Sequence, residues 1–273
     1  FLSKGQLIVY TKGRTQPRAE ARATGKGEFE TGDLVILIDE WSASASEILA
    51  GAIQDNDRGT IIGRRSFGKG LVQEAVPFSD GSALRLTVAR YYTPTGRSIQ
   101  KPYNNGFEEY YNDLNERMSR KEFEVSDSIH FNDSLKFTTP GGKIVYGGGG
   151  IMPDKFVPVD TNGVSNYFLK VRPLIYQYAL KYTEESRETL KKYSEANELE
   201  KYLDKQALLK RFTDYAAKSG VAADIEGLKV SGNIIHIQIK AYIARNILDN
   251  KGFYPVWEEI DTTLKYAIDF LNK

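Results

Sequence analysis

Short runs of apolar, β-branched residues alternate with polar stretches through the first part of this chain. The runs at 6–11 (QLIVYT) and 34–38 (LVILI) have polar flanks, as buried strands do. Between them, residues 12–33 are polar and glycine-rich, which predicts a surface connection. Further strands are predicted at 60–63, at 71–78 and at 82–92, with a Ser-Asp-Gly turn between the last two.

Apolar residues at helical spacing follow the second of these runs. Ile48, Leu49, Ala52 and Ile53 fall on one face of a predicted helix, and Gly59 supplies its end. The order strand, helix, strand and then hairpin predicts an α/β layer with a mixed sheet.

The rest of the chain has a different character. Residues 104–135 are acidic and rich in Tyr and Asn, which predicts a surface excursion. Apolar character returns at 136–154, where four consecutive glycines require backbone conformations closed to other residues. Beyond about residue 160, apolar residues recur at three-to-four spacing. We therefore predict a core over 1–160 and a C-terminal α-helical subdomain over 161–273, packed on itself and on the core.

Composition narrows the classes of partner and chemistry. The chain has 37 Lys and Arg against 36 Asp and Glu, a net charge of +1, which gives no electrostatic reason to expect nucleic acid or an anionic membrane. No apolar run is long enough to predict a membrane-spanning segment. The absence of cysteine excludes disulfides, thiolate metal sites and a cysteine nucleophile.

Ser44 lies where a predicted strand gives way to the predicted helix. The order Ser44-Ala45-Ser46-Glu47 fits a capping box, and Ser42 and Ser46 compete for the role of cap. A serine here also projects from the carboxyl edge of the sheet, where the active sites of open α/β folds gather. The first N–H groups of the helix, that of Ala45 foremost, can stabilise the oxyanion of a tetrahedral intermediate. Position alone leaves both interpretations open, a helix cap and a nucleophile.

Lys69 is the candidate base for Ser44. It lies in the segment SFGKG (66–70), beside an aromatic residue and between glycines that let the backbone pack closely. A lysine can act as a base if burial favours its neutral form, whereas the alternative is an ordinary solvated lysine in a glycine turn. Gln73, four residues on in a strand, could accept a hydrogen bond from the amine and orient it.

Two other chemistries have weaker support. His130 lies in the polar stretch and His236 on an apolar helical stripe typical of a core, and neither has an orienting carboxylate nearby in the sequence. Residues 63–69 match the G-x-x-x-x-G-K spacing of a phosphate-binding loop, but Gly70 stands where a hydroxyl should follow. A strand rather than a helix is predicted next. We therefore predict neither a Ser-His-Asp triad nor a nucleotide site.

These residues occur together in one known family. The segment from Asp33 to Gln100 resembles the carboxy-terminal processing (tail-specific) serine peptidases through its S-A-S-A-S-E, F-G-K-G-x-V-Q and Y-Y-T-P-x-G-R-S-I-Q elements. KGQLIVYTKGR and GGKIVYGGGGIMPD look like the flanking core strands of the family, so the resemblance extends to about residue 160. It implies a mixed-sheet α/β core similar to ClpP and crotonase.

The resemblance also implies roles for residues. The nucleophile falls on Ser44, the general base on Lys69 and the lysine-orienting glutamine on Gln73, while the Ala45 N–H serves the oxyanion. Asp55 matches a position implicated in some members, although we favour an exposed carboxylate at a helix end. The implied reaction is cleavage of polypeptides near their C-termini through an acyl-enzyme, without a metal or cofactor. The alternative is a latent or non-catalytic scaffold for peptide binding or assembly.

The chain departs from the family pattern in places. Trp41 stands where glycine is usual just before S-A-S-A-S. The family's upstream arginine- and glycine-rich strand-turn, which supplies a second oxyanion donor, and its PDZ domain have no counterpart in this sequence. We therefore expect a fragment of a longer precursor with impaired activity. The resemblance implies the bacterial periplasm or cell envelope as the compartment and a polypeptide as the partner, and it leaves a homo-oligomer open.

Overall fold

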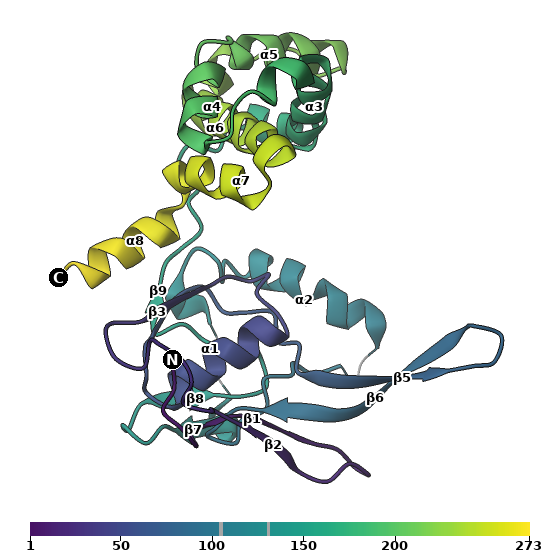
Figure 1. Cartoon of the computed structure of the whole chain (residues 1–273), viewed down its shortest axis with the longest axis vertical. Coiled ribbons are helices and arrows are strands. Elements are labelled where there is room, and N and C mark those ends of the chain that lie inside the picture. The colour runs from purple at the N-terminus through teal and green to yellow at the C-terminus, as the bar shows by residue number, and fades with distance from the viewer. Residues whose placement is uncertain (104–105, 130–131) are drawn as a thin grey trace. The chain divides into compact units, whose positions relative to one another are not determined.

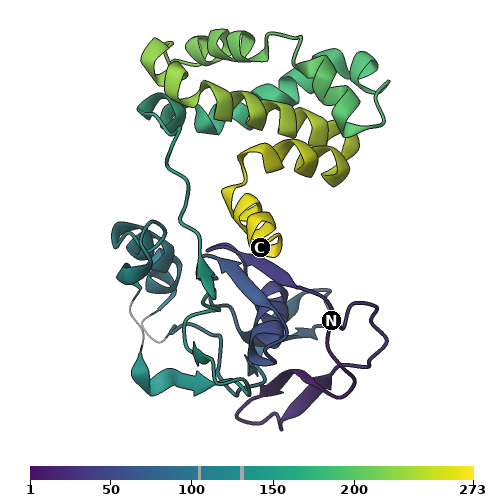
Figure 2. The same cartoon turned by 90° about the vertical axis from the view of Figure 1, so that its left-hand side faces the viewer.

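The computed structural model describes residues 1–103, 106–129 and 132–273. The chain forms two compact units, one made of residues 1–159 and 266–273 and the other of residues 160–265. Figures 1 and 2 show strands gathered in the first unit and helices in the second. Each unit is described by itself below.

Three sheets build the first unit, and they confirm the predicted mixed α/β class. The largest is antiparallel with the order β2-β1-β6-β5, from β1 (Leu7–Lys12), β2 (Ala19–Arg22), β5 (Leu71–Pro77) and β6 (Ala83–Tyr92). The second is parallel with the order β3-β4-β9, from β3 (Val35–Ile38), β4 (Thr60–Gly63) and β9 (Lys155–Phe156). The third pairs β7 (Lys136–Thr138) with β8 (Ile144–Tyr146).

Helix α1 (Ala45–Asp55) supplies much of the core of this unit. Of the apolar face predicted from the helical spacing, Ala52 and Ile53 are buried together with Ala50 against Ile61 and other aliphatic side chains, whereas Leu49 is exposed. A Cβ at Gly51 would lie 2.7 Å from Thr93 Cγ2, so glycine lets the helix approach the turn that follows β6. Close packing on this side fixes the helix whose first turn carries Ser44.

The structure corrects two predicted connections. Residues 12–33 include β2, whose side chains are all exposed, so hydrophobic patterning gave no sign of a strand there. The stretch 104–135 contains helix α2 (Phe107–Ser119) and two short 3₁₀ turns, Ser126–Ser128 and Asp133–Leu135. It is not wholly a surface excursion, because Arg117 and Glu122 are buried in the first unit.

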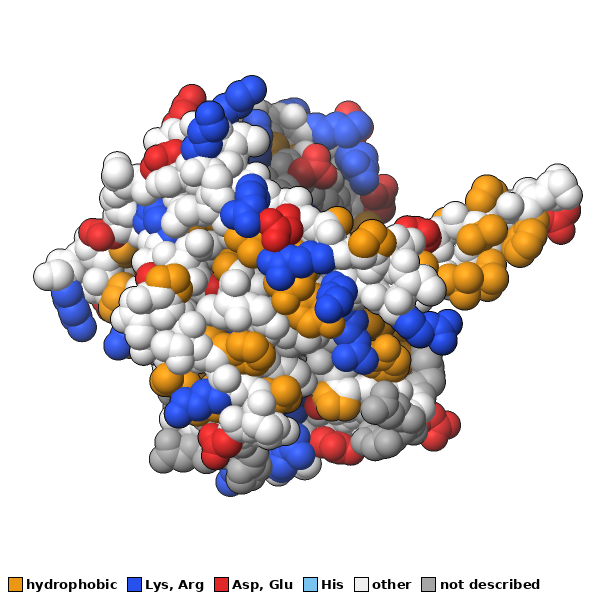
Figure 3. Space-filling model, turned by 90° about the horizontal axis from the view of Figure 1, so that it is seen from below, with side chains coloured by type: hydrophobic (Ala, Val, Ile, Leu, Met, Phe, Trp, Pro, Cys, Tyr) orange, Lys and Arg blue, Asp and Glu red, His pale blue; other side chains and the backbone are white. Residues whose placement is uncertain are grey.

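The β5–β6 hairpin carries an exposed apolar face. Val76 pairs with Leu84 and Glu74 with Leu86, so these side chains lie on the same side of the ribbon. Val76, Leu84 and Leu86 are exposed, as is Phe78 two residues beyond Val76. Figure 3 shows hydrophobic side chains gathered on the arm that projects at the right, which is this hairpin.

Six helices follow β9, confirming the predicted helical region. They are α3 (Asn166–Leu190), α4 (Ala196–Leu203), α5 (Leu208–Lys218), α6 (Ile225–Leu248), α7 (Asn250–Trp257) and α8 (Thr262–Leu271), with the 3₁₀ turn Glu258–Ile260 before the last. Apolar side chains of α3–α7 form one core. Residues 266–273 belong to the first unit, where Ala267 and Phe270 pack with Ile62, Val35 and Val157. Within the described part of the chain, no helix has the length and hydropathy needed to cross a membrane.

A buried lysine joins α6 to α4 in the helical unit. Lys240 Nζ donates to Glu200 Oε1 at 2.6 Å and to Asp204 Oδ1 at 2.9 Å. Burial lowers the pKa of Lys240, but the hydrogen bonds to Glu200 and Asp204 outweigh it, and the net shift is upward. The ammonium ion is therefore the form that holds the two helices at neutral pH.

We expect Lys240→Met to lower the free energy of unfolding of the helical unit by about 1–3 kcal/mol, because two carboxylates lose their buried partner. Trp257 stacks on Phe253 with ring centroids 5.0 Å apart, so its fluorescence in a Trp41→Phe background reports urea unfolding of this unit. Lys229→Met on the same helix removes the exposed Lys229–Glu226 pair and should change little. Equal effects of the two substitutions would contradict the prediction.

Candidate active site

Ser44 occupies a sharp bend between β3 and α1. The bend starts at Asp39, whose carboxylate accepts from the N–H of Trp41 and from the N–H and hydroxyl of Ser42. Ser44 is the N-cap of α1, with φ of 58° and ψ of −118°. A positive φ is costly for a residue with a Cβ, and strain of this kind clusters at functional sites. The side chain of Ser44 is half-buried.

Glu47 ties this bend to the segment that carries Lys69. Its side chain is 0% exposed. Oε2 accepts from the N–H of Ser44 at 2.9 Å and from the N–H of Lys69 at 2.8 Å. Oε1 accepts from the N–H of Gly68 at 2.7 Å and from the hydroxyl of Ser66 at 2.5 Å. A carboxylate has acceptor sites for four such donors, so this one group fixes both segments.

The backbone on both sides of Lys69 is held as well. The carbonyl of Gly68 accepts from Lys101 N, and the carbonyl of Gly70 accepts from Tyr91 N. The N–H of Gly70 donates to Gln100 Oε1 at 2.8 Å. A Cβ at Gly70 would lie 2.6 Å from Ile99 Cγ1, so only glycine allows this close packing. The glycines that flank Lys69 therefore lie in fixed positions.

The side chain of Lys69 differs from the prediction. It is exposed, so the burial expected to favour a neutral amine is not present in this structure. Gln73 on β5 is exposed too. Among the described residues, Lys69 Nζ forms no hydrogen bond with Ser44 or Gln73. The fold brings the backbones of Ser44 and Lys69 together and leaves the lysine amine in solvent.

The Ala45 N–H, predicted as the oxyanion donor, lies at the start of α1 next to Ser44. Ala45 is the first residue of α1 and is exposed. Its N–H has no hydrogen-bond partner in the part of the chain that the structure describes, as expected in the first turn of a helix. The next N–H groups of the turn are used, since Ser46 N donates to the Ala43 carbonyl and Glu47 N to the Ser44 carbonyl. The Ala45 N–H therefore remains without a partner among the described residues, next to Ser44 in the chain.

Asp55 requires a correction. It is not an exposed carboxylate at a helix end: it is 1% exposed and pairs with Arg97, which is 0% exposed. Arg97 Nη2 donates to Asp55 Oδ1 at 2.7 Å, and Asp55 Oδ2 accepts from the hydroxyl and the N–H of Thr95 at 2.6 and 3.1 Å. The pair anchors the end of α1 to the turn after β6. Asp55 thus contacts the turn after β6 and neither residue of the predicted dyad.

The described residues give no support to the two alternative chemistries, a Ser-His-Asp triad and a nucleotide site. His236 is part of the helical unit, where burial, and then the charge of Lys240, lower its pKa. His130 lies outside the described residues. The segment after Lys69 continues as strand β5, as predicted, so no helix N-terminus follows the G-x-x-x-x-G-K match. Within the described residues, no cluster of three or more His, Asp or Glu side chains could hold a metal ion.

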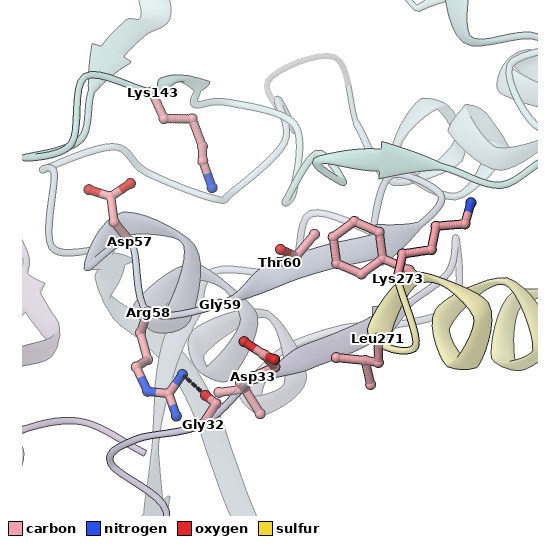
Figure 4. Close-up of a pocket in the computed structure, with 11 residues that line it drawn as sticks. Gly32, Asp33, Asp57, Arg58, Gly59, Thr60, Lys143, Leu271 and Lys273 are labelled. Atoms are coloured by element: carbon pink, nitrogen blue, oxygen red, sulfur yellow. Dashed lines mark hydrogen bonds between the residues drawn. The ribbon is translucent and has the colours of Figure 1, made fainter.

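A pocket of about 560 Å³ lies elsewhere on the first unit, between residues 32–34, residues 57–60 and the end of α8 (Figure 4). Two of the charged side chains that line it, Arg58 and Asp57, have partners within the unit. Arg58 donates to the carbonyls of Phe1, Gly32 and Phe29, and Asp57 accepts from the Thr139 hydroxyl and the Gly141 N–H. Neither Ser44 nor Lys69 lines this pocket.

Comparison with known families and proteins finds matches in both units of the chain. Residues 1–109 match the model of peptidase family S41, and residues 167–249 match a family of unknown function. A carboxy-terminal-processing protease of Bartonella bacilliformis is 52% identical over 101 residues, 37% of this chain and 23% of the relative. A chloroplastic C-terminal processing peptidase of Tetradesmus obliquus is 57% identical over 68 residues, 25% of this chain and 15% of the relative.

Residues 1–109 are thus similar to a family of serine peptidases, S41. The resemblance to carboxy-terminal processing peptidases is confirmed, and the matched relatives are bacterial and chloroplastic. The chain spans about a quarter or less of the length of these relatives, 23% and 15% of the two above. A solved structure, a photosystem II D1 C-terminal processing protease, is 30% identical with a TM-score of 0.38, over 58% of this chain and 28% of its own.

Proposed function

We propose that the first unit is the catalytic part of a serine endopeptidase that cleaves polypeptides near their C-termini. Ser44 is the nucleophile, Lys69 the general base and Gln73 the residue that orients the lysine amine. The observation that carries the proposal is the single oxygen, Glu47 Oε2, that accepts from the N–H groups of both Ser44 and Lys69. A site that joins two segments so far apart in sequence needs this kind of fixed frame.

The reaction follows from the chemistry of these groups. The neutral amine of Lys69 takes the proton of the Ser44 hydroxyl as Oγ attacks the peptide carbonyl. The Ala45 N–H donates to the oxyanion of the tetrahedral intermediate. The C–N bond then breaks, and the protonated lysine gives its proton to the departing amine. In the second step Lys69 takes a proton from water as the water attacks the resulting ester, and it returns that proton to Ser44 Oγ as the acyl C–O bond breaks.

The supporting parts of the proposal concern substrate and setting. In the described part of the sheet β5 is an edge strand that starts two residues after Lys69, so an extended polypeptide could pair along it as an added strand. Asp55 would support the site indirectly, by holding the end of α1 through Arg97. We propose that the protein acts in the bacterial periplasm or cell envelope. Light scattering would test whether it forms a homo-oligomer.

A second candidate function rests on the exposed Lys69 side chain. A dyad whose amine is in solvent and not bonded to the serine fits a latent peptidase or a peptide-binding scaffold. Apo sites are often loose and tighten only with substrate, so the two functions differ in whether substrate brings the Lys69 amine to Ser44. Acylation of Ser44 by a reactive probe separates the peptidase from the scaffold.

The test is acylation of Ser44 by a fluorophosphonate probe, followed by mass spectrometry, together with cleavage of an unfolded polypeptide. The parent chain should label at Ser44, Ser44→Ala should not label, and Lys69→Ala should label at least about a thousandfold more slowly. Circular dichroism checks that each variant is folded. Equal labelling with and without Lys69 would overturn the dyad. An unlabelled but folded parent that still binds the polypeptide would favour the scaffold.

A further inference from the structure

Arg117, at the end of α2, is among the most buried charged residues of the first unit. It is 0% exposed, and Glu122, which it contacts, is 3% exposed. Both lie beyond residues 1–109, the part that matches family S41. Burying a charge is costly unless hydrogen bonds replace its hydration, so the partners of Arg117 indicate what the burial serves.

Those partners are on the segment that leads to Lys69. Nη2 of Arg117 donates to the Arg65 carbonyl at 2.7 Å, and Nη1 donates to the Ser66 carbonyl at 3.1 Å. Nε donates to Glu122 Oε1 at 2.9 Å. One planar guanidinium therefore binds two consecutive carbonyls, which fixes the direction of the peptide units just before Phe67-Gly68-Lys69.

Two guanidinium groups share one carboxylate here, so backbone carbonyls must supply the remaining hydrogen-bond acceptors. Arg65 also pairs with Glu122, through contacts of 2.6 and 2.8 Å, so a single carboxylate serves two guanidinium groups. The excess positive charge is met by backbone oxygens, those of Arg65, Ser66 and Gly149. A rotation of the Ser66 peptide would leave Nη1 of the buried guanidinium without its acceptor.

Ser66 connects this cluster to the proposed site. Its carbonyl accepts from Arg117, while its hydroxyl donates to Glu47 Oε1 at 2.5 Å. Glu47 in turn accepts from the N–H groups of Ser44 and Lys69. The segment 65–69 is therefore held on one side by Arg117 and on the other by Glu47.

A second contact ties the same helix to the same segment. Lys101 Nζ lies 3.9 Å from the Phe67 ring centroid and 4.4 Å from the Tyr110 ring centroid, and it pairs with Asp113 at 3.0 Å. Phe67 belongs to the lysine segment, whereas Tyr110 and Asp113 belong to α2. Helix α2 is thus fastened to this segment at both of its ends.

We propose that Arg117 is a positioning residue for Lys69: by holding the carbonyls of Arg65 and Ser66, it sets the place from which the lysine amine reaches Ser44. The proposal rests on the proposed dyad and extends it to a part of the chain that the family match does not cover. Arg117 itself touches no substrate atom, so its effect should pass entirely through Lys69.

The test is a double-mutant cycle on the rate of Ser44 acylation by the fluorophosphonate probe. Arg117→Met should slow acylation about tenfold to a hundredfold when Lys69 is present, because a displaced base loses its alignment. In the Lys69→Ala background the same substitution should change nothing further. Arg117→Lys keeps the charge but cannot bind both carbonyls, and should fall between the parent and Arg117→Met. Arg120→Met, on the exposed side of the same helix end, is the matched control and should match the parent in both backgrounds.

The outcomes separate this proposal from the proposed function. An equal loss from Arg117→Met with and without Lys69 would show a general structural role and overturn the positioning role, while leaving the dyad intact. No loss from Lys69→Ala in the otherwise unchanged chain would overturn the dyad instead.

Amide hydrogen exchange gives a readout that does not depend on turnover. The N–H groups of Gly68 and Lys69 donate to Glu47, so exchange in residues 65–70 reports whether the segment is held. It should speed up about tenfold in Arg117→Met, less in Arg117→Lys and not in Arg120→Met, with α1 unchanged. Unaltered exchange at 65–70 in a folded Arg117 variant would overturn the proposal.

Discussion

Replacing Glu47 by glutamine is expected to slow acylation of Ser44 by about a hundredfold or more. The substitution keeps the size of the side chain but exchanges one acceptor oxygen for an NH₂ group. That group meets either the N–H donors of Ser44 and Lys69 or the Gly68 N–H and the Ser66 hydroxyl, and it cannot accept from them. The two segments of the site then lose their common anchor.

The same substitution should lower the free energy of unfolding of the first unit by about 2–4 kcal/mol, since a buried hydrogen-bond network loses acceptors. Calorimetry measures the stability, and probe labelling measures the acylation rate. Glu74→Gln, an exposed position on β5, is the matched control. An acylation rate like that of the parent in Glu47→Gln would show that the anchor is not needed for the chemistry.

Removing the charge of Asp55 is the second change with a large expected effect. Asp55→Asn leaves Arg97 buried without a counter-charge, and breaking a buried ion pair in this way costs about 3–5 kcal/mol. The loss should appear as a lower thermal midpoint of the first unit in calorimetry, with the helical unit unaffected. Glu20→Gln, at an exposed pair with Arg18 and Arg22, should leave the midpoint almost unchanged.

A second substitution distinguishes charge burial from lost contacts. Asp55→Asn combined with Arg97→Met should cost less than the sum of the two single changes, because neither charge is then left alone in the interior. Strict additivity would show that the two residues stabilise the unit independently. It would also contradict the proposed indirect support of the site through this pair.

The strands and helices were predictable wherever burial follows hydrophobicity. The runs at β1, β3 and β4 are apolar and β-branched, and each became a strand. Strand β2, with the sequence AEAR, was missed because it is exposed on all sides and is formed by pairing with β1 rather than by burial. Patterns of apolar residues contain no information about such a strand.

Buried charges account for the other misses. Asp55, Arg117 and Glu122 are polar, so a single sequence places them on the surface, yet each is buried with a partner of opposite charge. Asp55 and Arg97 are 42 positions apart in the chain, so no local spacing reveals the pair. For Glu47 a signal was present, because the capping-box pattern marked it as a residue that bonds back to Ser44.

The site was predictable in its framework and not in its side-chain detail. The family motifs led to Ser44 and Lys69, and the structure brings their backbones to one carboxylate. The environment of the lysine amine depends on every segment that could cover it, and motif matching does not supply that. The roles of Lys69 and Gln73 therefore stay predictions, to be decided by the labelling experiments.

The backbone conformation at Ser44 lowers the stability of the fold, whereas the proposed chemistry needs the serine hydroxyl at this position. Its φ of 58° and ψ of −118° suit glycine, and a residue with a Cβ held there costs on the order of 1–3 kcal/mol. Selection for stability alone would therefore replace Ser44 with glycine, and would lose the hydroxyl in doing so. Descendants of this chain that no longer need the hydroxyl should drift toward glycine at this position. Serine or glycine at this position in a related sequence would then indicate whether that protein still uses the site.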